Sequence, residues 1–496
     1  MRKEYRMKTS RRVFLKGIAG VAALGAGGCV TVRHSDRVKL AVVGIWGKGY
    51  EDMKWFLTHG KCEIVALCDC DRNMLPVTQA QLNKDGFNID ISKIPFFTDY
   101  RRMLDNAGKL GIEAMQISTP DHMHAAIAIN AMKMGIHVYV QKPLVRTLWE
   151  LERFRATARE RGLITQMGNQ GSSGSSFRRG VEILQNGILG DVSEVHVWTN
   201  RPVWPQGNWA KELLRRPDDP IPSGLDWDSW IGTAKMRPYK GERGVDRRDY
   251  PWCVKVGNTK VYHQFNWRGF SDFGAGALGD MASHLMNLPY RGLRLGAVAW
   301  TNCRIATEVG PGVYPAASIV DIGFAGRPEL KFTWYEGGLK PSADFTAPIL
   351  KAEAKGIPVG GCVIVGSKGT LYSTDNYGQT SYLMLKGESK PVSILEHEVC
   401  KDVAMRLPRR PEPGTTGNYG EFIDAILGAA PYIEDVHSRC YGDVEHSIPL
   451  MEGMLAACAA QCVPETRLNW DTSTQRFDNS VANGLIKPYV RSGWEF

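Results

Sequence analysis

The chain of 496 residues lacks the features that mark several large classes of protein. Beyond its N-terminal region it has no apolar run of about 18 residues, which excludes a multispanning membrane protein. Its 11 cysteines include no C-x-x-C pair and no zinc-ribbon spacing, so we expect buried core thiols. With 43% hydrophobic and 23% charged residues, the composition also excludes a disordered chain, a collagen and a coiled coil.

Positive charge is in modest excess, and most of the excess lies at one end. The formal net charge is +9, which could indicate a nucleic-acid partner. Residues 1–28 hold seven basic residues and one acidic residue, a net of +6, so the rest of the chain carries about +3. We therefore expect no nucleic-acid partner.

Residues 1–28 have the order of an export signal. A basic segment is followed by an apolar run, Gly17 to Gly28, which is too short to span a bilayer. The string S-R-R-V-F-L-K, from Ser10 to Lys16, resembles the twin-arginine signal, whose machinery exports folded proteins, often with a cofactor inside. We predict a twin-arginine signal peptide over residues 1–28, the twin-arginine machinery as a partner, and a periplasmic location.

Cys29 follows the small residues A-G-G and resembles the cleavage site of a bacterial lipoprotein. Ala26 stands where such sites usually have a larger apolar residue. Two forms therefore stay open: a lipoprotein anchored through Cys29 and facing the periplasm, and a soluble periplasmic protein.

A strand, a glycine loop, a helix and a second strand follow in order. Residues 38–45 form an apolar run typical of a buried parallel strand, and residues 63–69 form another. Asp69 lies 20 residues after Gly49, the spacing of the dinucleotide-binding fingerprint. The pattern predicts a Rossmann domain over residues 36–165 and an α/β domain over residues 166–496.

Each position of the loop has a physical reason. Gly44 permits a tight turn, and Gly49 permits close packing of helix on strand. The fingerprint would place glycine at Trp46, so we expect the close approach to the pyrophosphate at Gly47 instead. Asp69 can accept hydrogen bonds from ribose hydroxyls and would repel a 2′-phosphate, which favours NAD over NADP.

Three ordered motifs carry a resemblance to a known family. S-T-P-D-H-M-H spans Ser118 to His124, G-I-H-V-Y-V-Q-K-P-L spans residues 135–144, and G-A-L-G-D-M-A-S-H spans residues 276–284. Together they resemble the Gfo/Idh/MocA oxidoreductases. Two further strings, T-Q-M-G-N-Q-G over residues 165–171 and W-T-N-R-P-V-W-P-Q-G over residues 198–207, resemble the exported bacterial branch. The resemblance implies a Rossmann domain followed by an α/β domain with a large open, mainly antiparallel sheet, and a homo-oligomer packed through that sheet.

The resemblance also assigns residues to the site. It implies that Thr119, Pro120 and His124 line the cofactor site. Lys142 matches the lysine of the family's E-K-P motif, although Gln141 replaces the usual glutamate. It further implies that Asp280 and His284 form the D-x-x-x-H pair.

The same pair has a chemical rationale of its own. Asp280 and His284 are four residues apart in an expected helix, Leu278 to Leu288 stopped by Pro289, so both face one side. Aspartate can orient an imidazole that acts as a general base. Lys142 can stabilise a developing alkoxide and also border the cofactor. No third ligand stands at a recognisable spacing, so we expect no metal.

Aromatic and basic residues of the second domain suggest a carbohydrate substrate. Aromatic faces stack on sugar C–H surfaces, and arginine recognises hydroxyl groups. The candidates for substrate contact are Arg201, Trp204, Trp267 and Arg268.

Three functions remain open. The first is an NAD(P)-dependent oxidoreductase acting on a carbinol carbon of a sugar, glycoside or cyclitol. The second is a redox-assisted glycoside hydrolase or isomerase with tightly bound, recycled NAD. The third is a non-catalytic sugar-binding lipoprotein on the same fold.

Overall fold

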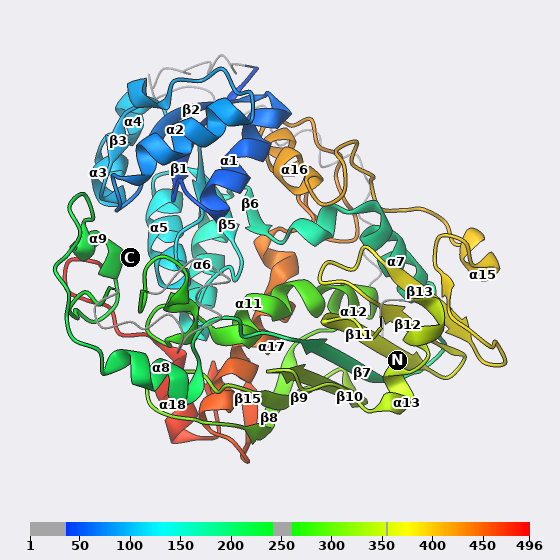
Figure 1. Cartoon of the computed structure of the whole chain (residues 1–496). Coiled ribbons are helices and arrows are strands. Elements are labelled where there is room, and N and C mark those ends of the chain that lie inside the picture. The colour runs from blue at the N-terminus through cyan, green and yellow to red at the C-terminus, as the bar shows by residue number, and fades with distance from the viewer. Residues whose placement is uncertain (1–35, 242–259, 354–355) are drawn as a thin grey trace, which may run out of the picture. The chain divides into compact units, whose positions relative to one another are not determined.

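The computed structural model describes residues 36–241, 260–353 and 356–496. The predicted signal peptide and Cys29 lie outside the described residues, so export and lipidation stay predictions. Residues 36–496 form one compact unit, which contains two β-sheets with helices between them (Figure 1).

The first sheet of the described residues is a six-stranded parallel sheet with the order β3-β2-β1-β4-β5-β6. This is the Rossmann order, and its chain reversal lies between β1 and β4. Its strands are nearly continuous apolar runs because helices cover both faces. The strands are β1 (Val38–Val43), β2 (Cys62–Cys68), β3 (Phe96–Phe97), β4 (Ala114–Ile117), β5 (His137–Gln141) and β6 (Thr165–Gly168).

Helices alternate with these strands, as the βαβ pattern predicted. They are α1 (Lys48–His59), α2 (Met74–Lys84), α3 (Tyr100–Asp105), α4 (Ala107–Leu110), α5 (Asp121–Lys133) and α6 (Leu148–Arg161), with the 3₁₀ turn η1 (Ile91–Lys93). The sheet ends at Gly168, a few residues beyond the predicted boundary at 165, and the division into two domains stays a prediction.

The second sheet has ten strands among the described residues, in the order β14-β13-β12-β11-β7-β10-β9-β8-β15-β16. Neighbours are antiparallel except β7 and β10, which are parallel. The strands are β7 (Val192–Thr199), β8 (Val298–Ala306), β9 (Ser318–Phe324), β10 (Arg327–Glu336), β11 (Gly360–Gly366), β12 (Gly369–Ser373), β13 (Ser381–Leu385), β14 (Val392–Ser393), β15 (Arg467–Asp471) and β16 (Arg476–Phe477). The predicted fold class is confirmed.

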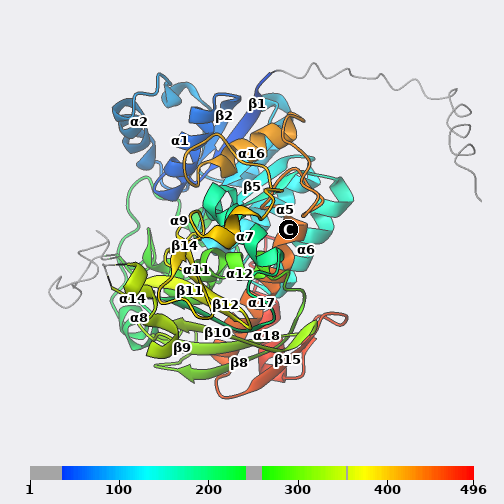
Figure 2. The ribbon, with the colours of Figure 1, turned by 90° about the vertical axis from the view of Figure 1, so that its right-hand side faces the viewer.

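A layer of helices lies between the two sheets (Figure 2). The long helix α17 contacts β8 and β9 of the second sheet and α6 of the Rossmann region. The larger helices of this part are α7 (Ser175–Gln185), α11 (Gly276–Leu285), α12 (Asn287–Gly292), α16 (Gly417–Ile426) and α17 (Val444–Cys462). The shorter ones are η2 (Gln170–Ser173), α8 (Gly207–Leu214), α9 (Trp227–Ile231), η4 (Asn266–Gly269), α13 (Ala343–Thr346), α14 (Ile349–Ala352), α15 (Glu398–Lys401) and α18 (Ser480–Ile486).

The helix expected from Leu278 to Leu288 is wrong at both ends. Helix α11 begins at Gly276 and ends at Leu285, and Pro289 lies inside the next helix, α12. Proline is tolerated there because it is in the first turn, where a backbone N–H has no intrahelical acceptor. Asp280 and His284 nevertheless share one helix, as predicted.

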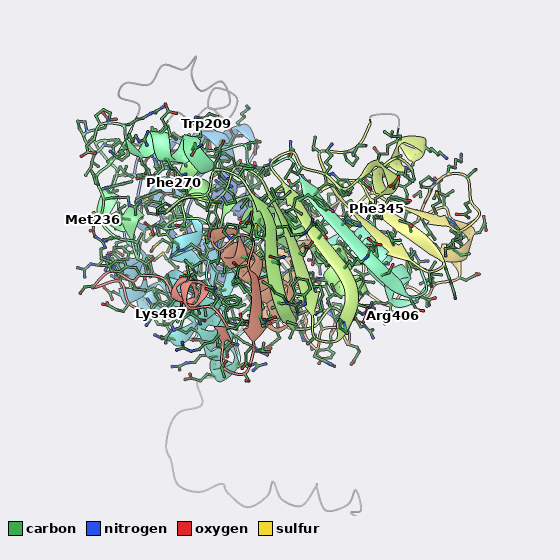
Figure 3. All side chains as sticks on the ribbon, turned by 90° about the horizontal axis from the view of Figure 1, so that it is seen from below. Trp209, Met236, Phe270, Phe345, Arg406 and Lys487 are labelled. Carbon is green, nitrogen blue, oxygen red and sulfur yellow. The ribbon has the colours of Figure 1, made fainter. Side chains whose placement is uncertain are left out.

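The outer face of the second sheet is seen in Figure 3, where its strands cross the view with side chains standing toward the viewer. The resemblance predicts association of subunits through this sheet, which stays a prediction. Within the described ranges, no helix is long and apolar enough to cross a membrane. The described cysteines are free thiols and most of them are buried, as expected of core residues.

Candidate active site

A cavity of about 740 Å³ opens at the carboxyl ends of β1, β4 and β5. This is where a Rossmann sheet places its ligand, beside the reversal of strand order. One side, which we call the floor, consists of the residues that follow these strands and β2. The opposite side, which we call the wall, comes from segments far along the chain: Arg201–Trp204, residues 260–268, α11 and Asn376–Tyr377.

The glycine loop of the floor has the geometry of a phosphate cradle. Gly44 has a φ of 82°, and a Cβ there would lie 2.6 Å from the carbonyl oxygen of Ser118. A Cβ on Gly49 would lie 1.9 Å from the carbonyl oxygen of Gly44, so helix α1 packs directly on the turn. Gly47, with a φ of 60°, caps α1 and lines the cavity beside the exposed Trp46. The first N–H groups of α1 therefore face the space where a pyrophosphate would bind.

Asp69 lies in the cavity lining at the end of β2. Its carboxylate accepts hydrogen bonds from the backbone N–H groups of Ile45 and Asp71, both at 3.0 Å. Burial raises the pKa of Asp69 to about 6, although both backbone bonds oppose the shift. The nearby Arg72 guanidinium lies over the Phe96 ring, 4.9 Å from its centre, so its flat face is already covered.

Three residues after β4 were predicted to line the cofactor site, and they differ in position. Thr119 and Pro120 line the cavity, and the Oγ1 atom of Thr119 is buried without a partner among the described residues. His124 lies behind them, with ring nitrogens 2.9 Å from the Thr119 carbonyl and 2.7 Å from the Pro143 carbonyl. Burial lowers the pKa of His124 to about 4. His124 thus joins the two loops that follow β4 and β5.

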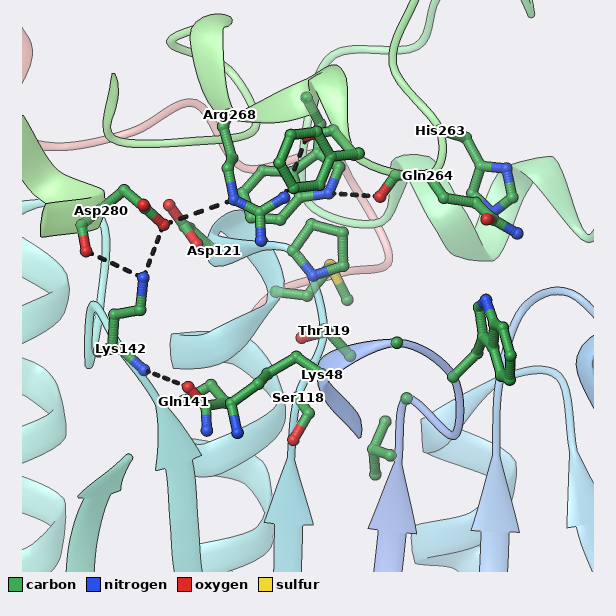
Figure 4. Close-up of a pocket in the computed structure, with 18 of the residues that line it drawn as sticks. Lys48, Ser118, Thr119, Asp121, Gln141, Lys142, His263, Gln264, Arg268 and Asp280 are labelled. Atoms are coloured by element: carbon green, nitrogen blue, oxygen red, sulfur yellow. Dashed lines mark hydrogen bonds and ion pairs between the residues drawn. The ribbon is translucent and has the colours of Figure 1, made fainter. Parts of the chain in front are cut away.

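Lys142, Asp280 and Arg268 form a charged cluster across the cavity (Figure 4). The Lys142 ammonium donates to the Asp280 carboxylate at 2.7 Å and to the Asp280 carbonyl at 2.9 Å. The Arg268 Nε lies 3.4 Å from the same carboxylate. Burial alone would raise the pKa of Asp280, but the two cations outweigh it and hold the pKa at about 2. Asp280 is therefore ionised at neutral pH.

His284 is 6% exposed and lines the cavity one helical turn after Asp280. Its Nδ1 lies 3.4 Å from the Oδ1 of Asn169, whose amide nitrogen donates to the Ser283 carbonyl. We expected Asp280 to orient the imidazole, and this expectation is wrong. The Asp280 carboxylate binds Lys142, and Asn169 contacts the imidazole instead. Burial lowers the pKa of His284 well below its ordinary value. With Nδ1 donating to Asn169, the imidazole is neutral and Nε2 is available as a base.

All four predicted substrate residues line the cavity. Arg268 lies over the rings of Phe265 and Trp267, at 4.5 and 4.2 Å from their centres. The indole N–H of Trp204 donates to the Gln206 side chain, and the indole N–H of Trp267 donates to the Gln264 carbonyl. These tryptophans can therefore offer a ligand apolar surface rather than a hydrogen bond.

A buried carboxylate, Asp52, was missed by the sequence reasoning. It is fully buried in α1 and pairs with Lys48 one turn earlier, a spacing that could have been noticed. It also accepts hydrogen bonds from Ser118 at 2.7 Å and from Tyr419 at 2.7 Å. The Gln141 amide donates to both its oxygens, at 2.8 and 3.0 Å. Glutamine at 141 therefore fits, because a glutamate would place a second carboxylate against Asp52.

Comparison with known proteins is consistent with this geometry. The model of the Gfo/Idh/MocA oxidoreductase family, an NAD-binding Rossmann fold, matches residues 38–169. A Glycosyl hydrolase family 109 protein of Solibacter usitatus is 31% identical over 158 residues, 29% of this chain and 36% of that protein. A 1-carboxy-3-chloro-3,4-dihydroxycyclo hexa-1,5-diene dehydrogenase of Comamonas testosteroni is 29% identical over 160 residues, 32% of this chain and 37% of that protein. The chain thus spans about a third of the length of these relatives.

Solved structures extend the likeness in fold over most of the chain. An inositol dehydrogenase homolog of Azotobacter vinelandii, in complex with NADH and myo-inositol, aligns with a TM-score of 0.57 at 15% identity. The alignment covers 88% of this chain and 98% of that one. Residues 38–169 therefore have a Rossmann fold and match the NAD-binding domain of the Gfo/Idh/MocA oxidoreductases.

Proposed function

We propose that the protein is an NAD-dependent oxidoreductase that acts on a carbinol carbon of a sugar, glycoside or cyclitol. One observation carries the proposal. The Lys142–Asp280 pair and His284 face the same cavity that the glycine loop and Asp69 line. A base for a hydroxyl proton therefore stands opposite a site built for a dinucleotide.

The floor fits NAD. Gly44 and Gly49 let the turn and helix α1 pack closely, Gly47 has open space beside it in the cavity lining, and Asp69 offers a carboxylate to the adenosine ribose. The buried, unpartnered Thr119 Oγ1 is a polar atom that a bound cofactor would satisfy. When bound, the nicotinamide accepts or returns a hydride. We propose NAD rather than NADP because the Asp69 carboxylate would repel a 2′-phosphate.

The wall, together with Lys142 of the floor, supplies the proton chemistry. The His284 Nε2 takes the proton of the substrate hydroxyl while Asn169 holds the ring. An ammonium has three N–H donors, and Lys142 uses two of them on Asp280, which leaves one for the substrate oxygen. Asp280 keeps Lys142 in place, and the cation stabilises the developing alkoxide. Arg268, Trp204 and Trp267 border the space left for the sugar.

A second candidate is redox-assisted glycoside processing with a retained, recycled cofactor. It is favoured by the relatives named Glycosyl hydrolase family 109 proteins, which match about a third of their length. The predicted twin-arginine signal supports it too, because the periplasm does not normally supply free NAD. Transient oxidation acidifies the neighbouring C–H and permits elimination of a glycoside, so net oxidation is absent.

Purification of the natively exported protein tests both candidates. Mass spectrometry would show whether nucleotide is bound and whether Cys29 carries lipid. Turnover of a sugar or cyclitol that depends strictly on added NAD supports the first candidate. Turnover of a glycoside without added cofactor supports the second. A protein with no nicotinamide bound and no turnover would overturn both and favour a non-catalytic sugar-binding lipoprotein.

A further inference from the structure

Besides Asp69 and Asp280, the cavity contains a carboxyl group that the proposed oxidation does not use. Asp121 is the first residue of α5, is 4% exposed and lines the cavity beside Asp280 (Figure 4). Its Oδ2 accepts the backbone N–H of Ala275, 3.1 Å away, at the residue that precedes α11. Among the described residues no donor is recorded for the other oxygen.

The charged groups that face Asp121 are Arg268, Lys142 and Asp280. Both cations are already engaged by Asp280, with the Lys142 ammonium at 2.7 Å and the Arg268 Nε at 3.4 Å. Within the described part of the chain, no ion pair joins either cation to Asp121. Burial consequently dominates and raises the pKa of Asp121 to about 7.

The carboxyl groups of Asp280 and Asp121, which line the same cavity, thus have widely different pKa values. Asp280 is ionised at neutral pH, whereas the raised pKa of Asp121 lets its carboxyl hold a proton there. Divergent environments of this kind mark acid and base partners in enzyme sites. A simple carbinol oxidation releases a single proton, which His284 can accept, so it needs no second carrier.

We propose that Asp121 is a second catalytic proton carrier, which donates a proton to the leaving oxygen of a glycoside. This inference rests on the second candidate function, redox-assisted glycoside processing. It places the donor at the start of α5 and the base on α11, both lining one cavity.

His284 takes the hydroxyl proton and passes it to solvent, while the hydride goes to the nicotinamide. His284 next takes the proton from the acidified C–H, the bond to the glycosidic oxygen breaks, and its electron pair goes to that oxygen. The oxygen takes the Asp121 proton and leaves as an alcohol. Water then adds in the reverse sense: its oxygen bonds the carbon that lost the alcohol, its proton goes to Asp121, and His284 returns its proton to the neighbouring carbon. The same hydride reduces the carbonyl, whose oxygen takes a proton from solvent through His284. The net change is hydrolysis.

Leaving-group dependence tests the role directly. The probes are a methyl glycoside, whose leaving oxygen requires a proton, and a nitrophenyl glycoside, whose leaving oxygen does not. With the protein as isolated, Asp121→Asn is expected to lower kcat on the methyl glycoside by about 100-fold or more and to leave the nitrophenyl glycoside within a few-fold. Asp121→Glu should keep part of the activity on the methyl glycoside that Asp121→Asn loses. Asp90→Asn, an exposed change outside the cavity, should alter neither rate.

The outcomes separate the inference from the function. Equal effects of Asp121→Asn on both glycosides, or no effect, overturn the role of Asp121 while the function stands. Wild-type protein that cleaves neither glycoside overturns the function and the inference with it. Infrared spectroscopy adds a readout independent of turnover: a protonated-carboxyl band should titrate near pH 7 in the wild type. The buried Glu336, whose pKa is also raised to about 7, contributes to both proteins, so the difference spectrum of wild type minus Asp121→Asn isolates the Asp121 band. The absence of this difference band would overturn the inference.

Discussion

The floor and the wall of the cavity are built by different means. The floor consists of short turns that follow β1, β2, β4 and β5, and its shape depends on backbone clearance at Gly44 and Gly49. The wall joins α11 to segments near residues 201–204 and 260–268, and charge holds its Asp280 and Arg268 together and to Lys142 of the floor. We therefore expect added atoms to disrupt the floor, and the loss of charged or proton-carrying groups to disrupt the wall.

The largest expected effect comes from the proton carrier of the wall. His284→Ala removes the proposed general base, so we expect kcat to fall by about 10²- to 10⁴-fold while NAD still binds. Steady-state kinetics and calorimetric titration with NAD measure the two quantities. His437→Ala, whose exposed side chain lies outside this cavity, serves as the control. Full turnover by His284→Ala would disprove the role of the imidazole.

A single added methyl group, in Gly49→Ala, tests the close backbone packing of the floor. In Gly49→Ala the new Cβ would stand 1.9 Å from the Gly44 carbonyl oxygen, and backbone cannot yield there as a side chain would. We expect a loss of about 3 kcal/mol in the free energy of unfolding and a loss of NAD binding. Denaturant titration and calorimetry measure both. Gly108→Ala is the matched control, because a Cβ there meets no described atom within 4 Å. An unaltered Gly49→Ala variant would contradict the packing.

Cofactor choice should depend on a single carboxylate of the floor. Asp69→Ser removes the acceptor for the ribose hydroxyls and the repulsion of a 2′-phosphate. We expect NAD to bind about 10- to 100-fold more weakly, since hydrogen bonds to charged groups contribute about 1.5–3 kcal/mol. The affinity for NADP should fall less than the affinity for NAD, or rise. Fluorescence titration with both nucleotides checks this, and an unchanged ratio of the two affinities would exclude Asp69 as the determinant.

The smallest effect concerns Gln141, which faces the buried Asp52. Gln141→Glu places two carboxylates together, so one must bind a proton with a raised pKa. Because a raised carboxyl pKa costs stability above the pKa of the unfolded chain, we expect a deficit of about 1–2 kcal/mol at neutral pH that shrinks as the pH falls. Gln141→Met is the control without added charge. A pH-independent deficit in denaturant titrations would contradict the like-charge explanation.

Local pattern was enough to predict the floor. Gly44, Gly49 and Asp69 stand within one βαβ unit, where parallel strands bring their carboxyl ends to one edge. The sequence pattern did not predict the roles of Asn169 and Tyr419. Asn169 contacts His284 and Tyr419 contacts Asp52, in each case more than a hundred positions away in the chain. Asp121 lies inside a motif that was noticed, but only burial beside an already paired Asp280 makes it chemically distinct.

By itself the sequence determined the order of strands and helices in the Rossmann region, the glycine loop and the acid after β2. Those features follow from hydrophobic periodicity and backbone sterics over a few dozen residues. Only the tertiary structure decided which partner each charged group takes. Lys142 binds Asp280, Asn169 rather than Asp280 orients His284, and Gln141 meets Asp52. Such choices depend on distance and burial, because the energy of a charge is set by its neighbours in space.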